Sequence, residues 1–365
     1  MTPLFFSLIR LSIGTSNTLS HHPSTDEWEI LYRMAVKQSL VGVCFAGVRR
    51  FLEIAQQCGE GTSIPQKLYY QWLGAAIQIQ QRNELMNRRC VELQSKLRSS
   101  GFKSSIMKGQ GIAVLYGELK DLRQPGDIDV YVDCGRETAI EYARSIGQEE
   151  VDWDYKHLHL NVFNDTEVEM HYRPDVSCNP FRNPRLQKFW IRYKDDLFYG
   201  KEDLGSGTIN CPNDTMHIFF LLHHTYRHVI SGGVGLRQIM DFYFALKNRN
   251  ISADDRLIAW AHECGLTKIS RALMWILVNV FGAVKDSLPW DINEKEGQFL
   301  LQEIMIGGNF GKADHRYSTA YNRLSILLNV FKRNLHLISH YGCDALFAPL
   351  YYIWHFCWKR LVKKY

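Results

Sequence analysis

Residues 123–133 read RQPGDIDVYVD, and this stretch decides the fold class. A Pro-Gly turn precedes strict alternation of apolar and polar side chains, which predicts a strand with one apolar face. Asp127 and Asp129 would share the opposite face, two residues apart. Neighbouring carboxylates repel each other unless water or a cation separates them. The pair therefore indicates either a site for Mg²⁺ or Mn²⁺, which prefer oxygen ligands, or a solvated edge strand protected from aggregation by acidic residues.

A glycine motif lies just upstream, where residues 101–117 read GFKSSIMKGQGIAVLYG. A short strand ending near Met107 would run into a turn at Lys108 and Gly109, and then into a helix. Glycine at such a junction lets backbone N–H groups approach a phosphate, and a helix N-terminus favours negative charge. Lys108 would add a point charge for the same anion. An ordinary turn has the same sequence, so the motif gains weight only from the acidic strand that follows.

A hairpin is predicted downstream, with arms at residues 156–163 and 167–174 and a turn at Asn164 and Asp165. Both arms alternate between apolar and polar side chains. The polar faces carry ionisable side chains: His157, His159, Glu167, Glu169 and His171. A half-exposed sheet without chemistry normally carries Thr, Lys, Ser and Gln there instead. The pattern favours a sheet with helices on one side and a reactive site on the other.

This order of elements resembles the DNA polymerase beta-type nucleotidyltransferase superfamily: strand, glycine turn, helix, Gly-Asp-x-Asp strand, and a third carboxylate on a later strand. The chain looks most like a bacterial branch called uncharacterised nucleotidyltransferases. The residues that carry this likeness are Lys108-Gly109, Leu115-Tyr116, Arg123, Gly126-Asp127-Ile128-Asp129 and Val168-Glu169-Met170-His171. The resemblance extends to HTYRH at 224–228 and LRQIMD at 236–241, and covers most of residues 30–245. Gln110 departs from it, because the superfamily usually has a hydroxyl side chain after the glycine.

The resemblance implies an α+β fold, with a small mixed sheet, helices on one of its faces, and flanking N- and C-terminal helical regions. It implies that Asp127, Asp129 and Glu169 are catalytic and bind Mg²⁺ or Mn²⁺. The nucleotide-binding residues would be Lys108, Gly109, Gln110, Arg123 and Gly126. A nucleoside monophosphate would pass from an NTP, with ATP favoured, to a hydroxyl on an unidentified small molecule, protein or RNA, releasing pyrophosphate.

Composition is compatible with this interpretation. The chain has 365 residues, 46% hydrophobic and 22% charged, enough for two or three domains with sizeable cores. A net charge of +5 suits an anionic substrate without requiring nucleic acid. The nine cysteines are odd in number and contain no Cys-x-x-Cys. This argues against a disulfide framework or a zinc ribbon, and predicts a reducing, cytoplasmic location.

The pattern predicts three regions: a helical region at 1–98, a nucleotidyltransferase core at 99–205 and a helical domain at 206–365. The apolar residues 4–13 are interpreted as a buried helix rather than a signal peptide, and no stretch is long enough to cross a membrane. Residues 346–365 are aromatic with a basic end. We favour a packed terminal helix there; the alternative is an interfacial helix that touches an anionic membrane.

A histidine-rich helix is expected from about residue 213 to 229. His224 and His228 have the i, i+4 spacing of a zinc site, but packing or phosphate-side hydrogen bonding is the favoured role. Arg237 and Asp241 have the same spacing and are expected to pair on a helix surface. These side chains, if near the cleft, would contact nucleotide or acceptor: His171, His224, Arg227, His228, Arg237 and Asp241.

Two other functions stay open. A non-catalytic nucleotide- or partner-binding module would keep the sheet without the metal. A zinc hydrolase would use His224, His228 and other histidines, with little dependence on Mg²⁺.

Overall fold

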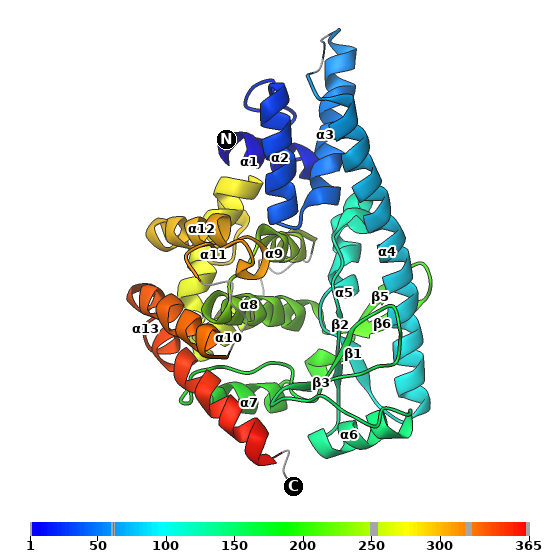
Figure 1. Ribbon diagram of the computed structural model, residues 1–365, viewed down its shortest axis with the longest axis vertical. Helices are drawn as coiled ribbons and strands as arrows, with labels where there is room; N and C mark the ends of the chain where they lie inside the picture. The colour runs from blue at the N-terminus through cyan, green and yellow to red at the C-terminus, as the bar shows by residue number, and fades with distance from the viewer. Residues whose placement is uncertain (1, 60, 62, 249–254, 318–322, 363–365) are drawn as a thin grey trace.

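The computed structural model describes residues 2–59, 61, 63–248, 255–317 and 323–362, and it confirms an α+β fold. A four-stranded sheet has the strand order β1-β2-β4-β3, and a separate hairpin pairs β5 with β6. The larger sheet lies between the long helix α4 on one side and the end of α8 on the other (Figure 1). Helices flank the sheet at both ends of the chain, as predicted.

Four helices precede the sheet: α1 (Thr2–Ile13), α2 (Thr25–Lys37), α3 (Val41–Gln57) and α4 (Gln66–Ser99). α1 packs against α3 and α11, and most of its apolar side chains are buried. The prediction of a buried helix at residues 4–13 is therefore confirmed. At the start of α2, Ser24 and Glu27 form a capping box, which satisfies two backbone N–H groups that would otherwise lack partners.

The four strands are short: β1 (Ser104–Ile106), β2 (Ile128–Val132), β3 (His157–His159) and β4 (Val168–His171). β2 and β4 run parallel, whereas β1 pairs antiparallel with β2 and β3 antiparallel with β4. The predicted first arm of the hairpin, 156–163, is longer than β3. A hydrogen bond from the Leu160 N–H to the Val168 carbonyl extends the contact by one residue, and the chain then turns away.

The apolar face of the sheet is as the alternation predicts. Ile128, Val130 and Val132 are buried in one core together with Leu158 and Met170 from the neighbouring strands. Helices α4 and α6 (Arg136–Ser145) cover this face. Their contributing side chains are Met86, Cys90, Leu93, Leu97, Ala139, Tyr142 and Ala143. Burial of this face fixes the strand register, because a slip by one residue would turn the apolar side chains outward.

The helix predicted after the glycine motif is short. α5 (Gln110–Ala113) makes one turn and continues as the 3-10 helix η1 (Val114–Leu122), which Gly117 interrupts with a φ of 61°. Residues 204–207 join β5 (Gly200–Asp203) to β6 (Thr208–Cys211). This hairpin spans the predicted boundary at 205/206, and the three-region division stays a prediction.

The C-terminal part is helical. Two of its helices precede the β5–β6 hairpin: α7 (Asn183–Arg192) and the 3-10 helix η2 (Asp195–Leu197). The α-helices after the hairpin are α8 (Asp214–Ser231), α9 (Leu236–Asn248), α10 (Asp255–Glu263), α11 (Thr267–Phe281), α12 (Glu294–Gly307) and α13 (Arg323–Val362). Two further 3-10 helices are η3 (Lys285–Ser287) and η4 (Asn309–Gly311). α8 is buried along most of its length and crosses the middle of the molecule (Figure 1). Within the described ranges, no helix is both long and apolar enough to span a membrane.

α13 packs through part of its aromatic surface. Trp354 and Trp358 form edge-on contacts with Tyr155, and Trp358 also contacts Trp153. Lys359 forms an ion pair with Asp152 in the same region. These contacts support the packed-helix interpretation. Other apolar side chains of α13 are exposed, so the membrane-contact alternative stays a prediction; residues 363–365 of its basic end lie outside the described residues.

Candidate active site

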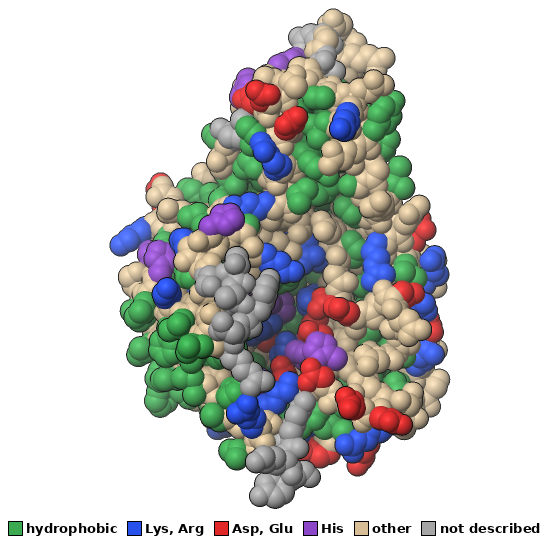
Figure 2. All heavy atoms as spheres, viewed as in Figure 1, with side chains coloured by type: hydrophobic (Ala, Val, Ile, Leu, Met, Phe, Trp, Pro, Cys, Tyr) green, Lys and Arg blue, Asp and Glu red, His purple; other side chains and the backbone are tan. Residues whose placement is uncertain are grey.

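Two carboxylates lie side by side on the polar face of the sheet. Asp129 on β2 is in register with Glu169 on the adjacent parallel strand β4. His159 on β3 pairs with Glu169, and His157 pairs with His171. Because paired residues of adjacent strands point to the same face, these side chains form two rows across the sheet. Figure 2 shows acidic, basic and histidine side chains gathered in a hollow on this face of the molecule.

Lys108 lies between the two aspartates of the acidic strand. Its Nζ is 3.0 Å from Asp127 Oδ1 and 2.5 Å from Asp129 Oδ2. The Asp129 side chain is almost fully buried, whereas Asp127 is partly exposed. Burial opposes ionisation of Asp129, but Lys108 and a hydrogen bond from His171 outweigh it and hold the pKa of this carboxyl well below its usual range. The same carboxylates raise the pKa of Lys108 against its own burial, so Lys108 and Asp129 are both charged at neutral pH.

His171 bridges the two in-register carboxylates. Its Nε2 is 3.0 Å from Asp129 Oδ1 and 3.3 Å from Glu169 Oε2. Burial would lower the pKa of His171, but its hydrogen bonds to both carboxylates raise it overall. Burial would raise the pKa of Glu169, but the hydrogen bond from His171 contributes to lowering it to about 2. His171 thus forms one group with the three carboxylates and Lys108. We call this group, Lys108, Asp127, Asp129, Glu169 and His171, the carboxylate cluster.

The donor set fits a divalent cation. Asp127 Oδ1 and Asp129 Oδ2 converge on one point, which the Lys108 ammonium occupies here. Ligand atoms of Asp129, Glu169 and His171 also lie within 4.8 Å of one another. An oxygen-rich set of this kind suits Mg²⁺ or Mn²⁺, provided that Lys108 moves aside.

The glycine loop borders a pocket beside this cluster. Gly109 has a φ of 67°, a conformation that side-chain-bearing residues rarely adopt, and so its backbone depends on glycine. The pocket is lined by Lys108, Gly109, Arg123, Gly126, Asp127, Leu221, His224, Thr225, Arg237, Gln238, Asp241 and Phe310. Its volume of about 20 Å³ is close to that of one water molecule. The helix that follows is too short for its N-terminus alone to attract an anion.

Arg123 and Asp241 form a buried ion pair, so the predicted surface pairing of Arg237 with Asp241 is wrong. Arg123 Nε and one terminal nitrogen lie 2.6 and 2.7 Å from the two Asp241 oxygens. The Tyr116 hydroxyl donates to the same carboxylate at 2.6 Å. Arg237 instead donates to the Gln124 carbonyl at 3.0 Å. Helical i, i+4 spacing predicted the wrong partner because Arg123, which directly follows η1, reaches Asp241 on α9 through the core.

Gln110 points away from the pocket. Its amide nitrogen donates to the side-chain oxygens of Asn83 and Asn87 on α4. Of the predicted nucleotide-binding residues, Lys108, Gly109, Arg123 and Gly126 line the pocket, and Gln110 does not.

The histidines of α8 are packed around an arginine. His224 Nε2 and His228 Nε2 are 3.1 Å apart, and an Arg227 nitrogen is 3.2 Å from the latter. Burial is the main cause that lowers the pKa of both histidines well below the usual value. A guanidinium this close opposes a metal cation. Among the described residues, neither histidine belongs to a group of three metal-ligating side chains, which disfavours the zinc hydrolase that would use them.

Asp175 is a functional candidate that no motif in the sequence singles out. It is fully buried, with Arg227 Nε 2.9 Å from Oδ1 and His223 Nδ1 2.9 Å from Oδ2. Arg227 foremost, then His223, hold its pKa well below the usual range against the effect of burial. The only signal was its position directly after the hairpin, beside Pro174. The alternation of the hairpin places His157 and His159 on the polar face but indicates no role for them.

Two larger cavities lie outside the carboxylate cluster. One of about 370 Å³ borders the β3–β4 connection and is lined by Arg82, Gly126, His159, Leu160, Asn161, Phe163, Asn164, Asp165, Thr166, Glu167 and Val168. Another of about 500 Å³ lies by α3 and η1, and no predicted site residue lines it. The candidate site is therefore defined by its ionisable side chains and not by the size of a cavity.

Comparison with known proteins identifies the family. Residues 24–282, from the start of α2 to the end of α11, match the family described as "Uncharacterised nucleotidyltransferase". The chain belongs to this nucleotidyltransferase family. Among solved structures, it is similar to an antigenic nucleotidyltransferase-like protein from Paracoccidioides brasiliensis, with 12% identity and a TM-score of 0.35 over 57% of this chain and 93% of that one. A search of curated proteins gave no match. Family membership supports a nucleotidyl-transfer function.

Proposed function

We propose that this nucleotidyltransferase moves a nucleoside monophosphate from an NTP, with ATP favoured, to a hydroxyl of an unidentified acceptor. The observation that carries the proposal is the register of Asp129 with Glu169 on parallel strands, next to Asp127. A protein that used this fold only to bind a nucleotide or a partner would have no need to hold these carboxylates together. The free cysteines of the chain support a reducing, cytoplasmic location as part of the same proposal.

Asp127 and Asp129 would hold Mg²⁺ or Mn²⁺, with Glu169 as the third carboxylate. The ion would neutralise charge on the transferring phosphate and on the departing pyrophosphate. His171 would keep Asp129 and Glu169 ionised and correctly oriented by donating to both. Glu167 is exposed and lies outside this set, so the geometry supports Glu169 as the catalytic glutamate.

The acceptor oxygen would form a bond to the α-phosphorus as the bond from that phosphorus to pyrophosphate breaks. The hydroxyl proton would pass to Glu169 or to water. Lys108, Arg237 and the backbone at Gly109 line the adjacent pocket and would bind the phosphates. Since this pocket has room for about one water molecule, a nucleotide requires it to open. Arg123 would act indirectly, because Asp241 already engages its guanidinium.

The test combines binding with identification of the product. Each NTP is titrated against the protein with and without Mg²⁺, and candidate acceptors are then searched by mass spectrometry for an added nucleotide. Asp127→Asn and Asp129→Asn should each nearly abolish transfer in protein that circular dichroism shows to be folded, since neither side chain belongs to the apolar core of the sheet. Near wild-type turnover by either variant would refute the assignment. Nucleotide binding without any transfer would favour the non-catalytic alternative.

A further inference from the structure

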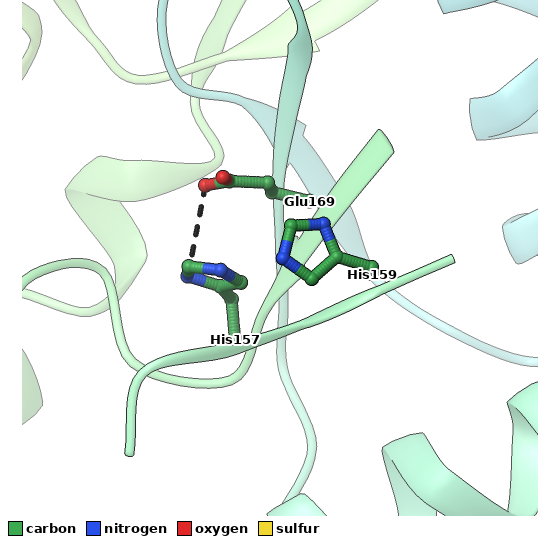
Figure 3. Close-up of side chains that lie close together, drawn as sticks. All are labelled: His157, His159 and Glu169. Carbon is green, nitrogen blue, oxygen red and sulfur yellow. Dashed lines mark ion pairs between the residues drawn. The ribbon is translucent and has the colours of Figure 1, made fainter. Parts of the chain in front are cut away.

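We propose that His157, His159 and Glu169 form a binding site for a transition-metal ion of the zinc class, separate from the Asp127–Asp129 pair. All three lie on the β3–β4 hairpin, and their ligand atoms are within 4.8 Å of one another. Figure 3 shows the two imidazole rings beside the Glu169 carboxylate, with a ring nitrogen of His159 turned toward the space between them. The strand register produces this arrangement, because His159 pairs directly with Glu169.

The distance between two of the ligand atoms matches a metal site better than a hydrogen bond. His157 Nδ1 is 3.6 Å from Glu169 Oε2, beyond normal hydrogen-bonding distance. Two ligands that each lie about 2.1 Å from a tetrahedral Zn²⁺ are about 3.4 Å apart. A metal ion would therefore need only a small adjustment of these side chains.

An unsatisfied polar atom provides a second, independent observation. His157 is 9% exposed, and its buried Nδ1 has no hydrogen-bond partner. Buried polar atoms nearly always have a partner, and an ion or a water molecule bound at this position would supply the missing one. His159 is exposed, so an ion could enter from the solvent side.

The type of ligand determines the type of metal. Two imidazole nitrogens and one carboxylate favour Zn²⁺ and related transition ions, whereas Mg²⁺ prefers oxygen ligands. Asp127 and Asp129 offer only oxygen. Glu169 lies between the two positions, since its Oε2 is near both His157 and His171. The site would thus place two ions of different character on either side of one glutamate.

The experiment measures Zn²⁺ binding to the full chain by calorimetry, without nucleotide and with excess Mg²⁺ to occupy the aspartates. Wild-type protein should bind one Zn²⁺ tightly. His159→Ala should weaken binding by at least about 100-fold, because loss of a ligand costs more than the about 10- to 100-fold lost with an outer partner. His157→Ala should do the same. His262→Ala, which removes another exposed histidine, and Asp127→Asn should bind like wild type.

Absence of tight Zn²⁺ binding would overturn the proposal, and so would binding that survives both histidine substitutions or is lost in Asp127→Asn. His159→Ala keeps the test decisive if the buried His157 cannot be replaced without unfolding, which circular dichroism would reveal. Because the measurement uses no nucleotide, its failure leaves the nucleotidyl-transfer proposal intact. Failure of transfer, in turn, would not change the expected Zn²⁺ binding.

Discussion

Replacement of Lys108 by methionine should change metal binding and nucleotide binding in opposite directions. Methionine has a side chain of similar length but no charge. The Lys108 ammonium lies 3.0 Å from Asp127 and 2.5 Å from Asp129, at the point where these carboxylates would hold a cation. In the wild-type protein, a metal ion must displace the ammonium. Without it, Mn²⁺ should bind more tightly, and a triphosphate should bind more weakly because one phosphate-side cation is missing.

The structure gives the size of the effect. A hydrogen bond between charged groups is worth about 1.5–3 kcal/mol. If the metal no longer has to break one such contact, its affinity should rise by about 10- to 100-fold. Without metal, the variant also leaves Asp129 buried without its cation, and breaking a buried pair costs about 3–5 kcal/mol. Mg²⁺ should restore this lost stability, and so should raise the unfolding temperature of the variant more than that of wild type.

Calorimetric titrations of Mn²⁺ and of ATP, together with thermal unfolding with and without Mg²⁺, measure all three effects. Lys120→Met is the matched control, since Lys120 is exposed. It should behave like wild type in every assay. If Lys108→Met binds Mn²⁺ no better than wild type does, the ammonium does not occupy the metal position, and the reasoning is refuted.

Other residues give further tests. With Mg²⁺ and NTP held constant, Glu169→Gln should lower transfer by about 100-fold or more, and Glu167→Gln much less; the reverse order would move the catalytic role to Glu167. Asp241→Asn should lower the free energy of unfolding in urea by about 3–5 kcal/mol, because a buried guanidinium loses its counter-charge. A loss below about 1 kcal/mol, as for a surface pair, would contradict this. Gly109→Val should weaken nucleotide binding and leave Mn²⁺ binding unchanged; equal loss of both would mean that the glycine only makes a turn. Burial holds the pKa of His224 well below its usual value of 6.5. The unfolded chain therefore binds a proton that the folded chain does not, and in EDTA the stability should fall as the pH drops below about 6.5. His224→Phe should reduce this dependence between pH 6.5 and 5, and an unchanged slope would exclude His224 as its source.

Alternation along the strands predicted much of the sheet and of the site. It assigned Ile128, Val130 and Val132 to the core and Asp129 to the opposite face, because side chains on a strand alternate strictly. It also placed Glu169 and His171 on one face of β4. Alternation alone does not say which strands are neighbours. The family resemblance implied that Glu169 acts with Asp129, but the parallel pairing of β2 with β4, which brings the two side by side, is seen only in the structure.

Sequence patterns could not predict the buried ion pair of the site. Arg123 and Asp241 are 118 residues apart in sequence, and no local spacing rule links them. The i, i+4 rule suggested Arg237 instead, since that rule treats a helix as if it were isolated in water. In the folded protein, α9 is buried against η1, and a buried carboxylate takes the partner that fully satisfies it.

Hydrogen-bond donors and carboxylates alternate along the site, and one of the two donors can move whereas the other is fixed. Lys108 lies between Asp127 and Asp129, and His171 lies between Asp129 and Glu169. Lys108 is partly exposed and extends from a glycine loop, so it has somewhere to move when a metal ion arrives. His171 is fully buried within the sheet and stays in place. A triphosphate that enters with the metal would give the displaced ammonium a new anionic partner. Metal and nucleotide would then favour each other's binding through this one side chain, without any movement of the sheet.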